Sequence, residues 1–182
     1  MINPFFENNG PFKISDILQL LDLEVPITPN DQKINDIKDL FTSEKDDITF
    51  FHSKKYKDIA KNTKASFCLT TESLKNELPK NCKPLVVGNV LVSTSKVTSK
   101  FYPSSTNDNF DYTARDITET KFKDKVKYGK NVLIGDNVTL GSNCLIGHNT
   151  IIEQNVSIGD SCSIGSNVII RNTLIDNNVT VL

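Results

Sequence analysis

The sequence has little charge asymmetry and few of the residues on which catalysis most often depends. Its 182 residues carry 21 basic and 22 acidic side chains, for a net charge of −1. A nucleic-acid-binding domain would instead show a basic face. The chain contains two histidines, His52 and His148. It has no G-x-G-x-x-G motif, which argues against a glycine-rich nucleotide-binding turn.

Membrane, secretion and metal signals are also missing from the sequence. No stretch approaches the roughly 20 apolar residues that a membrane-spanning helix needs. Residues 1–10 lack the basic segment and the apolar run of a secretory signal peptide. The four cysteines show no metal-ligand spacing. We therefore expect no metal site, reduced thiols and a cytoplasmic location.

What the sequence does contain is a six-residue repeat from Val126 to Leu182. A large apolar residue returns at each sixth position, with a small or β-branched residue two places earlier and usually a glycine one place later. These large residues are Tyr128, Ile134, Leu140, Ile146, Ile152, Ile158, Ile164 and Ile170. A fixed short period is typical of a solenoid, whereas a β-sandwich would alternate without a strict period. The repeat predicts a left-handed parallel β-helix with about 18 residues in each coil.

The corners of the predicted coils carry asparagine and glycine. Both residue types tolerate positive φ at low cost, so we expect them to turn the chain there. The corner asparagines are Asn131, Asn137, Asn143, Asn149, Asn155 and Asn167.

Two details of the repeat lead to more specific predictions. Cys144 and Cys162 are one coil apart and should stack ~4.8 Å from each other, as packed thiols rather than as a disulfide. The next large residue of the repeat after Ile170 is Ile175, which follows after only five positions. We expect the register to shift at Asn172 and Thr173 through a tightened corner.

The first part of the chain alternates strand and helix patterns, which indicates a small α/β domain. Helices are predicted at residues 11–21, with Ser15 as N-cap, after Ser53, and at residues 90–101. Strands are predicted at residues 48–51, 65–70 and 84–87. We predict an α/β domain at residues 1–101, a linker at 102–111 and the β-helix at 112–182. Residues 112–125 should form a degenerate capping coil with Phe122 pointing inward.

Four segments before the repeat resemble one enzyme family. They read F-K-I-S-D-I-L-Q-L-L-D-L-E-V from Phe12, D-I-T-F-F-H-S-K-K-Y from Asp47, A-S-F-C-L-T from Ala65 and P-L-V-V-G-N from Pro84. Together with the hexapeptides that follow, they are similar to the UDP-3-O-acylglucosamine N-acyltransferases of lipid A biosynthesis. Hexapeptides occur in many acyltransferases, so the segment around Phe50 narrows the family most.

The resemblance implies a uridine-binding site in the first domain. In that family the uracil lies between two aromatic rings, which correspond here to Phe50 and Tyr56. Ser53 stands where the family usually has asparagine, and Lys54 where it often has proline. Aromatic faces suit a planar base, since stacking contributes about 1–3 kcal/mol per base. By spacing alone, both aromatic residues would be interpreted as core residues.

The resemblance also implies a reaction. A 3-hydroxyacyl chain passes from acyl carrier protein to the 2-amine of a UDP-glucosamine derivative, with histidine as general base, in a cytoplasmic homotrimer without a cofactor. His148, in I-G-H-N-T, resembles the family's I-A-H-N motif, but that motif comes several coils later, beyond Leu182. The general base is therefore unassigned and His148 is the remaining candidate. Because Val179–Leu182 ends in mid-repeat, we expect a C-terminally truncated chain that lacks the catalytic coils.

Two alternative functions stay open at this point. One is an acetyl-CoA-dependent sugar acetyltransferase that uses His148, as in enzymes with a short solenoid behind an α/β domain. The other is a non-catalytic trimer that binds nucleotide sugars. Neither alternative requires a metal, and no Ser/His/Asp arrangement is visible in the sequence.

Overall fold

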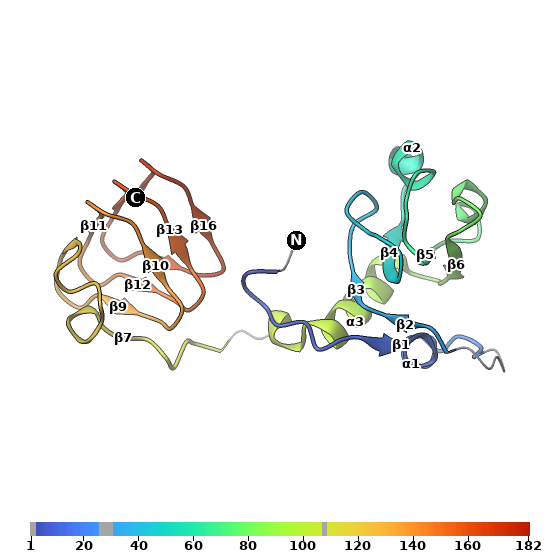
Figure 1. Ribbon diagram of the computed structural model, residues 1–182, viewed down its shortest axis with the longest axis horizontal. Coiled ribbons are helices and arrows are strands. Elements are labelled where there is room, and N and C mark those ends of the chain that lie inside the picture. The colour runs from blue at the N-terminus through green and yellow to red at the C-terminus, as the bar shows by residue number, and fades with distance from the viewer. Residues whose placement is uncertain (1–2, 26–30, 107–108) are drawn as a thin grey trace. The chain divides into compact units, whose positions relative to one another are not determined.

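The computed structural model describes residues 3–25, 31–106 and 109–182 (Figure 1). The chain forms two compact units, Phe6–Asn107 and a second unit that joins Met1–Phe5 to Asp108–Leu182. The first is a small α/β domain and the second is a three-sided parallel β-helix. The predicted fold class is confirmed.

The α/β domain is built from short strands and helices in alternation. Its elements are β1 (Phe12–Lys13), α1 (Ile14–Leu20), β2 (Lys33–Ile34), β3 (Asp36–Ile37), β4 (Asp47–Phe51), the 3-10 helix η1 (Lys54–Tyr56), α2 (Lys57–Ala60), β5 (Phe67–Thr70), η2 (Lys75–Glu77), β6 (Lys83–Val86), α3 (Val90–Phe101) and η3 (Pro103–Thr106). The helix predicted at residues 90–101 is confirmed with the same bounds.

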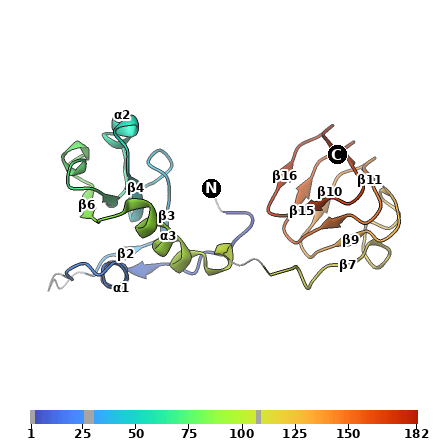
Figure 2. The same ribbon diagram turned by 180° about the vertical axis from the view of Figure 1, so that it is seen from behind.

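A four-stranded parallel sheet forms the centre of this domain. Its order is β3-β4-β5-β6, and all three neighbouring pairs are parallel. Helix α3 lies across one face of the sheet, as Figure 2 shows from behind, and its Val97 and Phe101 are fully buried there. Phe51 and Ala60 belong to a separate cluster of buried residues. Successive β4 residues thus contribute to different clusters, as the two-residue period of a strand requires.

The predicted cap of the first helix is wrong. Helix α1 follows directly on β1, whose pairing with β2 keeps Phe12 and Lys13 extended. The Ser15 hydroxyl donates to an Asp31 carboxylate oxygen at 2.7 Å instead of capping the helix. The hydrogen bonds from Ser15 lower the pKa of Asp31. A long-range partner therefore overrides the local preference of serine for the N-cap.

The β-helix unit begins with a short antiparallel strand and continues as two-residue strands. Its elements are β7 (Arg115–Asp116), η4 (Ile117–Glu119), β8 (Lys127–Tyr128), β9 (Leu133–Ile134), β10 (Thr139–Leu140), β11 (Leu145–Ile146), β12 (Ile151–Ile152), β13 (Ser157–Ile158), β14 (Ser163–Ile164), β15 (Ile169–Ile170), β16 (Leu174–Ile175) and β17 (Thr180–Val181). The strands form three sheets, β10-β13-β16, β8-β11-β14-β17 and β7-β9-β12-β15.

Successive coils pair with a constant separation in the sequence until one corner, where the separation becomes one residue shorter. Ile152 pairs with Ile170, a separation of 18 residues that recurs in the preceding coils. Ile158 instead pairs with Ile175, and Ile164 pairs with Val181, so both separations are 17. Between these pairs Asn172 adopts a φ of 48°. The predicted register shift is confirmed at the predicted corner.

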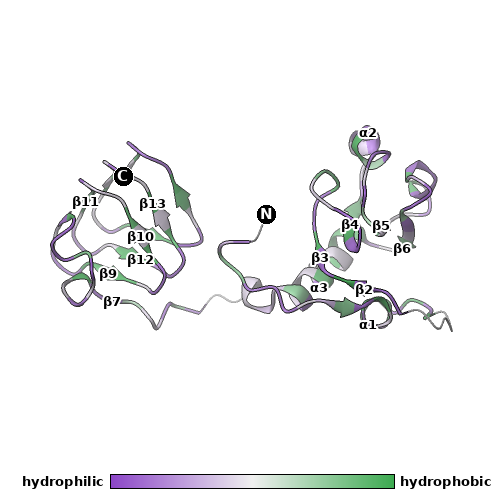
Figure 3. Cartoon of the chain, viewed as in Figure 1, coloured by the Kyte–Doolittle hydropathy of each residue, from purple (hydrophilic) through white to green (hydrophobic). Residues whose placement is uncertain are grey.

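The three sheets present different rows of side chains outward. On β9, β12 and β15 the row consists of Leu133, Ile151 and Ile169, which are paired in register. Both residues of β9 and of β12 are apolar, so these strands are green in Figure 3. The outward rows of the other two sheets mix polar and apolar residues. The row on β10, β13 and β16 consists of Thr139, Ser157 and Leu174, and the row on β8, β11, β14 and β17 consists of Lys127, Leu145, Ser163 and Thr180. We call the row of Leu133, Ile151 and Ile169 the aliphatic ladder.

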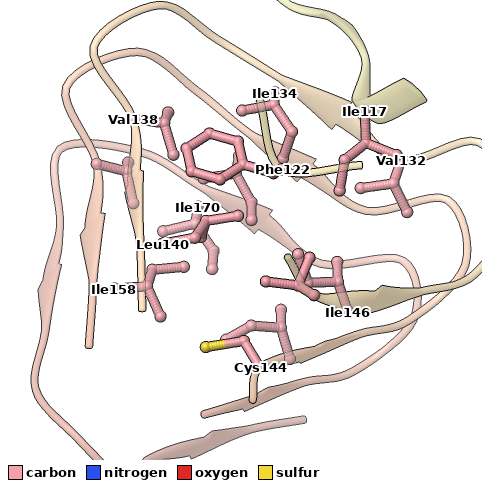
Figure 4. Packing of buried hydrophobic residues seen from close by; sticks show 14 of the residues in the cluster. Ile117, Phe122, Val132, Ile134, Val138, Leu140, Cys144, Ile146, Ile158 and Ile170 are labelled. Carbon is pink, nitrogen blue, oxygen red and sulfur yellow. The ribbon is translucent and has the colours of Figure 1, made fainter. Parts of the chain in front are cut away.

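The inward residues fill the bore of the β-helix (Figure 4). Phe122 is 4% exposed and lies at the start of this core, so its predicted inward position is confirmed. Cys144 and Cys162 are buried free thiols that each donate to a backbone carbonyl of the next coil at 3.1 Å. Packed thiols were predicted, and the prediction is confirmed.

Asparagine and glycine have separate roles at the corners. The six predicted asparagines have φ between 55° and 61°, whereas no glycine has positive φ. The explanation from positive φ is therefore wrong for glycine. At Gly147 a Cβ would lie 2.4 Å from the Ser166 nitrogen and 2.5 Å from the Gly165 carbonyl carbon. Glycine is needed here because the next coil passes too close for a side chain.

Two charged residues replace this glycine on successive coils. Glu153 and Arg171 stand after Ile152 and Ile170, where the motif has glycine. The Arg171 guanidinium donates to both Glu153 carboxylate oxygens, at 2.6 and 3.1 Å. It also donates to the Asn109 carbonyl at 3.2 Å, and so joins the segment before β7 to the third coil. A bidentate pair of this kind is strong because both donors are charged and aligned.

Alanine substitution at two glycines tests the role of coil spacing. Gly147→Ala should lower the unfolding free energy by about 3 kcal/mol, because its Cβ overlaps the next backbone. Gly88→Ala in the α/β domain should cost less than about 1 kcal/mol, since no atom lies within 4 Å of its Cβ. Urea unfolding followed by circular dichroism measures both, and equal losses would contradict the spacing argument.

Removing one member of the ion pair tests whether the two replacements depend on each other. Arg171→Ala should cost about 2 kcal/mol or more, because it leaves the largely buried Glu153 carboxylate without its bidentate partner. Adding Glu153→Gly to Arg171→Ala should recover part of that loss, because no buried charge is then left. Thermal unfolding of the two variants measures their relative stability. A double variant that is less stable than Arg171→Ala would exclude an energetic coupling between Glu153 and Arg171.

Candidate functional site

Three aromatic rings lie together at the carboxyl end of β4. The ring centroids of Phe50 and His52 are 6.5 Å apart with planes inclined by 24°. Those of His52 and Tyr56 are 5.8 Å apart and inclined by 48°. We call Phe50, His52 and Tyr56 the ring cluster. His52 is thus in contact with both residues that the family resemblance assigned to a uridine site.

The local sequence explains how these side chains meet. Phe50 and His52 are two residues apart at the end of a strand, so their side chains leave the backbone on the same side. The chain then turns into η1, which carries Tyr56 back toward the strand end. Phe50 packs against the buried cluster under α3, whereas Tyr56 remains 38% exposed. One ring is anchored in the core and the other faces solvent.

Ser53 begins the helical segment, as predicted. Its Oγ accepts a hydrogen bond from the backbone N–H of Lys55 at 3.4 Å. A hydroxyl that accepts a bond still has its own hydrogen to donate. Ser53 can therefore cap η1 and offer a donor to a ligand carbonyl at the same time.

The 3-10 helix η1 and the start of α2 carry three lysines, Lys54, Lys55 and Lys57. The Lys55 Nζ lies 5.9 Å from the centroid of the Tyr56 ring, within reach of a cation–π contact. Lys57 pairs with Glu77 at 2.7 Å, and its hydrogen bond lowers the pKa of that carboxyl. Lys54 is exposed in the same turn. The turn favours an anionic ligand.

The other strands of the sheet end at the same edge. Because β4, β5 and β6 are parallel, Thr71 and Gly88 follow strands that finish on the side of the ring cluster. Helix α3 starts there with Asn89 as N-cap, whose Oδ1 accepts from the Val92 N–H at 3.1 Å. The carboxyl edge of a parallel sheet is the usual position of ligand sites in α/β domains.

His148 belongs to the β-helix unit and not to the ring cluster. Its Nδ1 accepts a hydrogen bond from the backbone N–H of Lys130 at 2.8 Å, and the backbone N–H of His148 donates to the Ser166 hydroxyl at 3.0 Å. Similar side-chain bonds join neighbouring coils at other corners, such as the one from the Ser142 N–H to Asp160. The geometry gives His148 a structural role. Its catalytic role stays a prediction.

Sequence reasoning assigned no role to His52 and missed its ring contacts. The spacing of Phe50 and His52 could have indicated them, since residues two apart share one side of a strand.

In the described residues, no group of three or more His, Cys, Asp or Glu side chains could hold a metal ion. None of the helices described is long and apolar enough to cross a membrane.

Comparison with known proteins adds independent information on both units. Residues 31–99 match the family described as UDP-3-O-(3-hydroxymyristoyl) glucosamine N-acyltransferase, LpxD. Residues 126–160 and 137–172 match the bacterial transferase hexapeptide, a family of six repeats. The first match contains the whole ring cluster, and the second covers most of the stacked coils.

Curated relatives carry the corresponding name. The chain is 33% identical over 105 residues to a UDP-3-O-acylglucosamine N-acyltransferase of Rickettsia bellii, covering 56% of this chain and 31% of the relative. It is 31% identical over 100 residues to that of Rickettsia canadensis, covering 54% of this chain and 29% of the relative. The relative from Rickettsia rickettsii is 32% identical over 99 residues, with coverages of 54% and 29%.

The chain thus spans less than a third of the length of the curated relatives that it matches. The two family matches nevertheless follow each other in the order that the sequence predicted. Residues 31–99 are therefore similar to the UDP-3-O-acylglucosamine N-acyltransferase family, and residues 126–172 are similar to bacterial transferase hexapeptide repeats.

Proposed function

We propose that this chain takes part in the N-acylation of a UDP-glucosamine derivative in lipid A biosynthesis. The observation that carries the proposal is the ring cluster, which lies inside the matched residues 31–99 and at the carboxyl edge of a parallel sheet. Its α/β domain would hold the nucleotide, and its β-helix would form the first part of the acyltransferase solenoid.

The proposed nucleotide site uses Phe50, Ser53 and Tyr56. The uracil would stack on the two aromatic rings, and the Ser53 hydroxyl would donate to a uracil carbonyl while it caps η1. The exposed Lys54 and Lys55 add positive charge suited to the diphosphate. Asparagine, the usual family residue at position 53, could donate and accept together, so serine would hold the base with fewer hydrogen bonds.

The proposed acyl donor is a 3-hydroxyacyl thioester on acyl carrier protein. Attack of the sugar 2-amine on the thioester carbonyl forms an amide and releases the carrier thiol, so the transfer needs no cofactor. A general base must take a proton from the attacking amine, which suits a histidine near neutral pH. The buried free thiols of all four cysteines support a reducing, cytoplasmic setting.

The proposed assembly is a homotrimer through the β-helix. The aliphatic ladder supports it, because Ile169 is 65% exposed and continues the apolar row of Leu133 and Ile151. Contiguous apolar rows on a flat sheet face are typical of protein interfaces. Identical chains that bury such a face usually form a closed, symmetric oligomer, of which a trimer is one form.

Substitution of the two stacking residues tests the nucleotide site. Phe50→Ala and Tyr56→Ala should each weaken the binding of UMP by about 5- to 150-fold, the equivalent of about 1–3 kcal/mol of lost stacking. Calorimetry measures the affinity. Phe41→Ala is the matched control, because Phe41 is an 84% exposed aromatic residue in the loop before β4. Unchanged affinity in both site variants would exclude the proposed pocket.

A charge placed in the aliphatic ladder tests the assembly. Ile169→Glu should convert trimer into monomer, since burying an unpaired carboxylate at an apolar interface costs several kcal/mol. Sedimentation of the full chain reports the mass. Phe41→Glu, which changes an exposed apolar residue of the α/β domain in the same way, should leave the trimer intact. A wild-type chain that sediments as a monomer would refute the trimer.

A further inference from the structure

We infer that the His52 side chain occupies the ring faces of the nucleotide site in the free protein and must move aside when a base binds. The inference rests on the proposed function, because it assigns a further residue to the same site. It makes His52 a determinant of nucleotide affinity that acts by competition with the ligand.

The contacts of His52 carry this inference. Its imidazole lies 6.5 Å from the Phe50 centroid and 5.8 Å from the Tyr56 centroid. Both distances fall within the 4.5–7 Å at which aromatic rings attract each other. A base that stacks on Phe50 and Tyr56 needs contact with these rings at similar distances. The imidazole therefore fills part of the space that such a base would use.

The surroundings of His52 allow it to move. The side chain is exposed and directly follows the last residue of β4. No hydrogen bond ties its imidazole to the rest of the described chain. His148 differs, since its Nδ1 is held by the Lys130 N–H at 2.8 Å. Rotation of His52 into solvent therefore costs the two ring contacts and no hydrogen bond.

The opposite arrangement would make His52 a third wall of the site. In that case the imidazole would stay in place and stack on the base beside Phe50 and Tyr56. The two arrangements predict opposite effects when the imidazole is removed, so one binding measurement separates them.

The test is the affinity of UMP for the full chain carrying His52→Ala or His52→Phe. His52→Ala should bind UMP about two- to tenfold more tightly, because the ring contacts no longer compete. His52→Phe should bind no more tightly than wild type, since it retains a competing ring. Phe41→Ala should match wild type. Weaker or unchanged binding by His52→Ala, or tighter binding by His52→Phe, would overturn the inference.

Proton NMR gives a second and direct readout, because the chain has only two histidines. The His148→Ala variant assigns the remaining imidazole signal to His52. That signal should be displaced by the ring currents of Phe50 and Tyr56 and should move toward the position of a free histidine when UMP is added. A His52 signal that UMP leaves unmoved would overturn the inference.

Failure of the inference and failure of the proposed function can be told apart. A wild-type chain that does not bind UMP would refute the nucleotide site itself. Binding that depends on Phe50 and Tyr56 but is not tightened by His52→Ala would leave the site in place and remove only the competition by His52.

Discussion

The close stacking of successive coils is the constraint on which most of this structure depends. A coil of two-residue strands cannot bury its own apolar residues, so each strand must pair in register with the coils on either side. That pairing fixes the spacing of the coils. The spacing in turn excludes a Cβ at positions such as Gly147, so glycine is needed there. The asparagines have a separate cause, since the turn of the chain at each corner gives residues such as Asn149 a positive φ.

The fold was largely predictable because its determinants are local and periodic. The six-residue repeat indicated the β-helix, and the missing residue after Ile170 located the change of register. The predictions failed where the local structure depends on a residue distant in the sequence or on the distance between neighbouring backbones. Ser15 bonds to Asp31, which is far along the chain, and so does not cap its helix. The glycine at each corner was attributed to backbone φ, although the reason is an adjacent coil that no local pattern reveals.

The candidate site was predictable from resemblance more than from physical chemistry. Spacing alone gave no reason to separate Phe50 and Tyr56 from the other aromatic residues of the core. The structure confirms that Ser53 caps η1, and it adds that His52 contacts both rings. The second of these depends on side-chain rotation at a strand end, which a sequence pattern does not specify. The domain boundaries and the general base stay predictions.

The shortened corner at Asn172 shows that a coil is defined by its strand pairs and not by a count of residues. Each coil contacts only its neighbours. The corner that is one residue shorter therefore changes one edge of the β-helix and leaves the later strands paired. Residues beyond this corner can no longer be equated with earlier ones by steps of 18. Any comparison of repeats must be aligned on the strands instead.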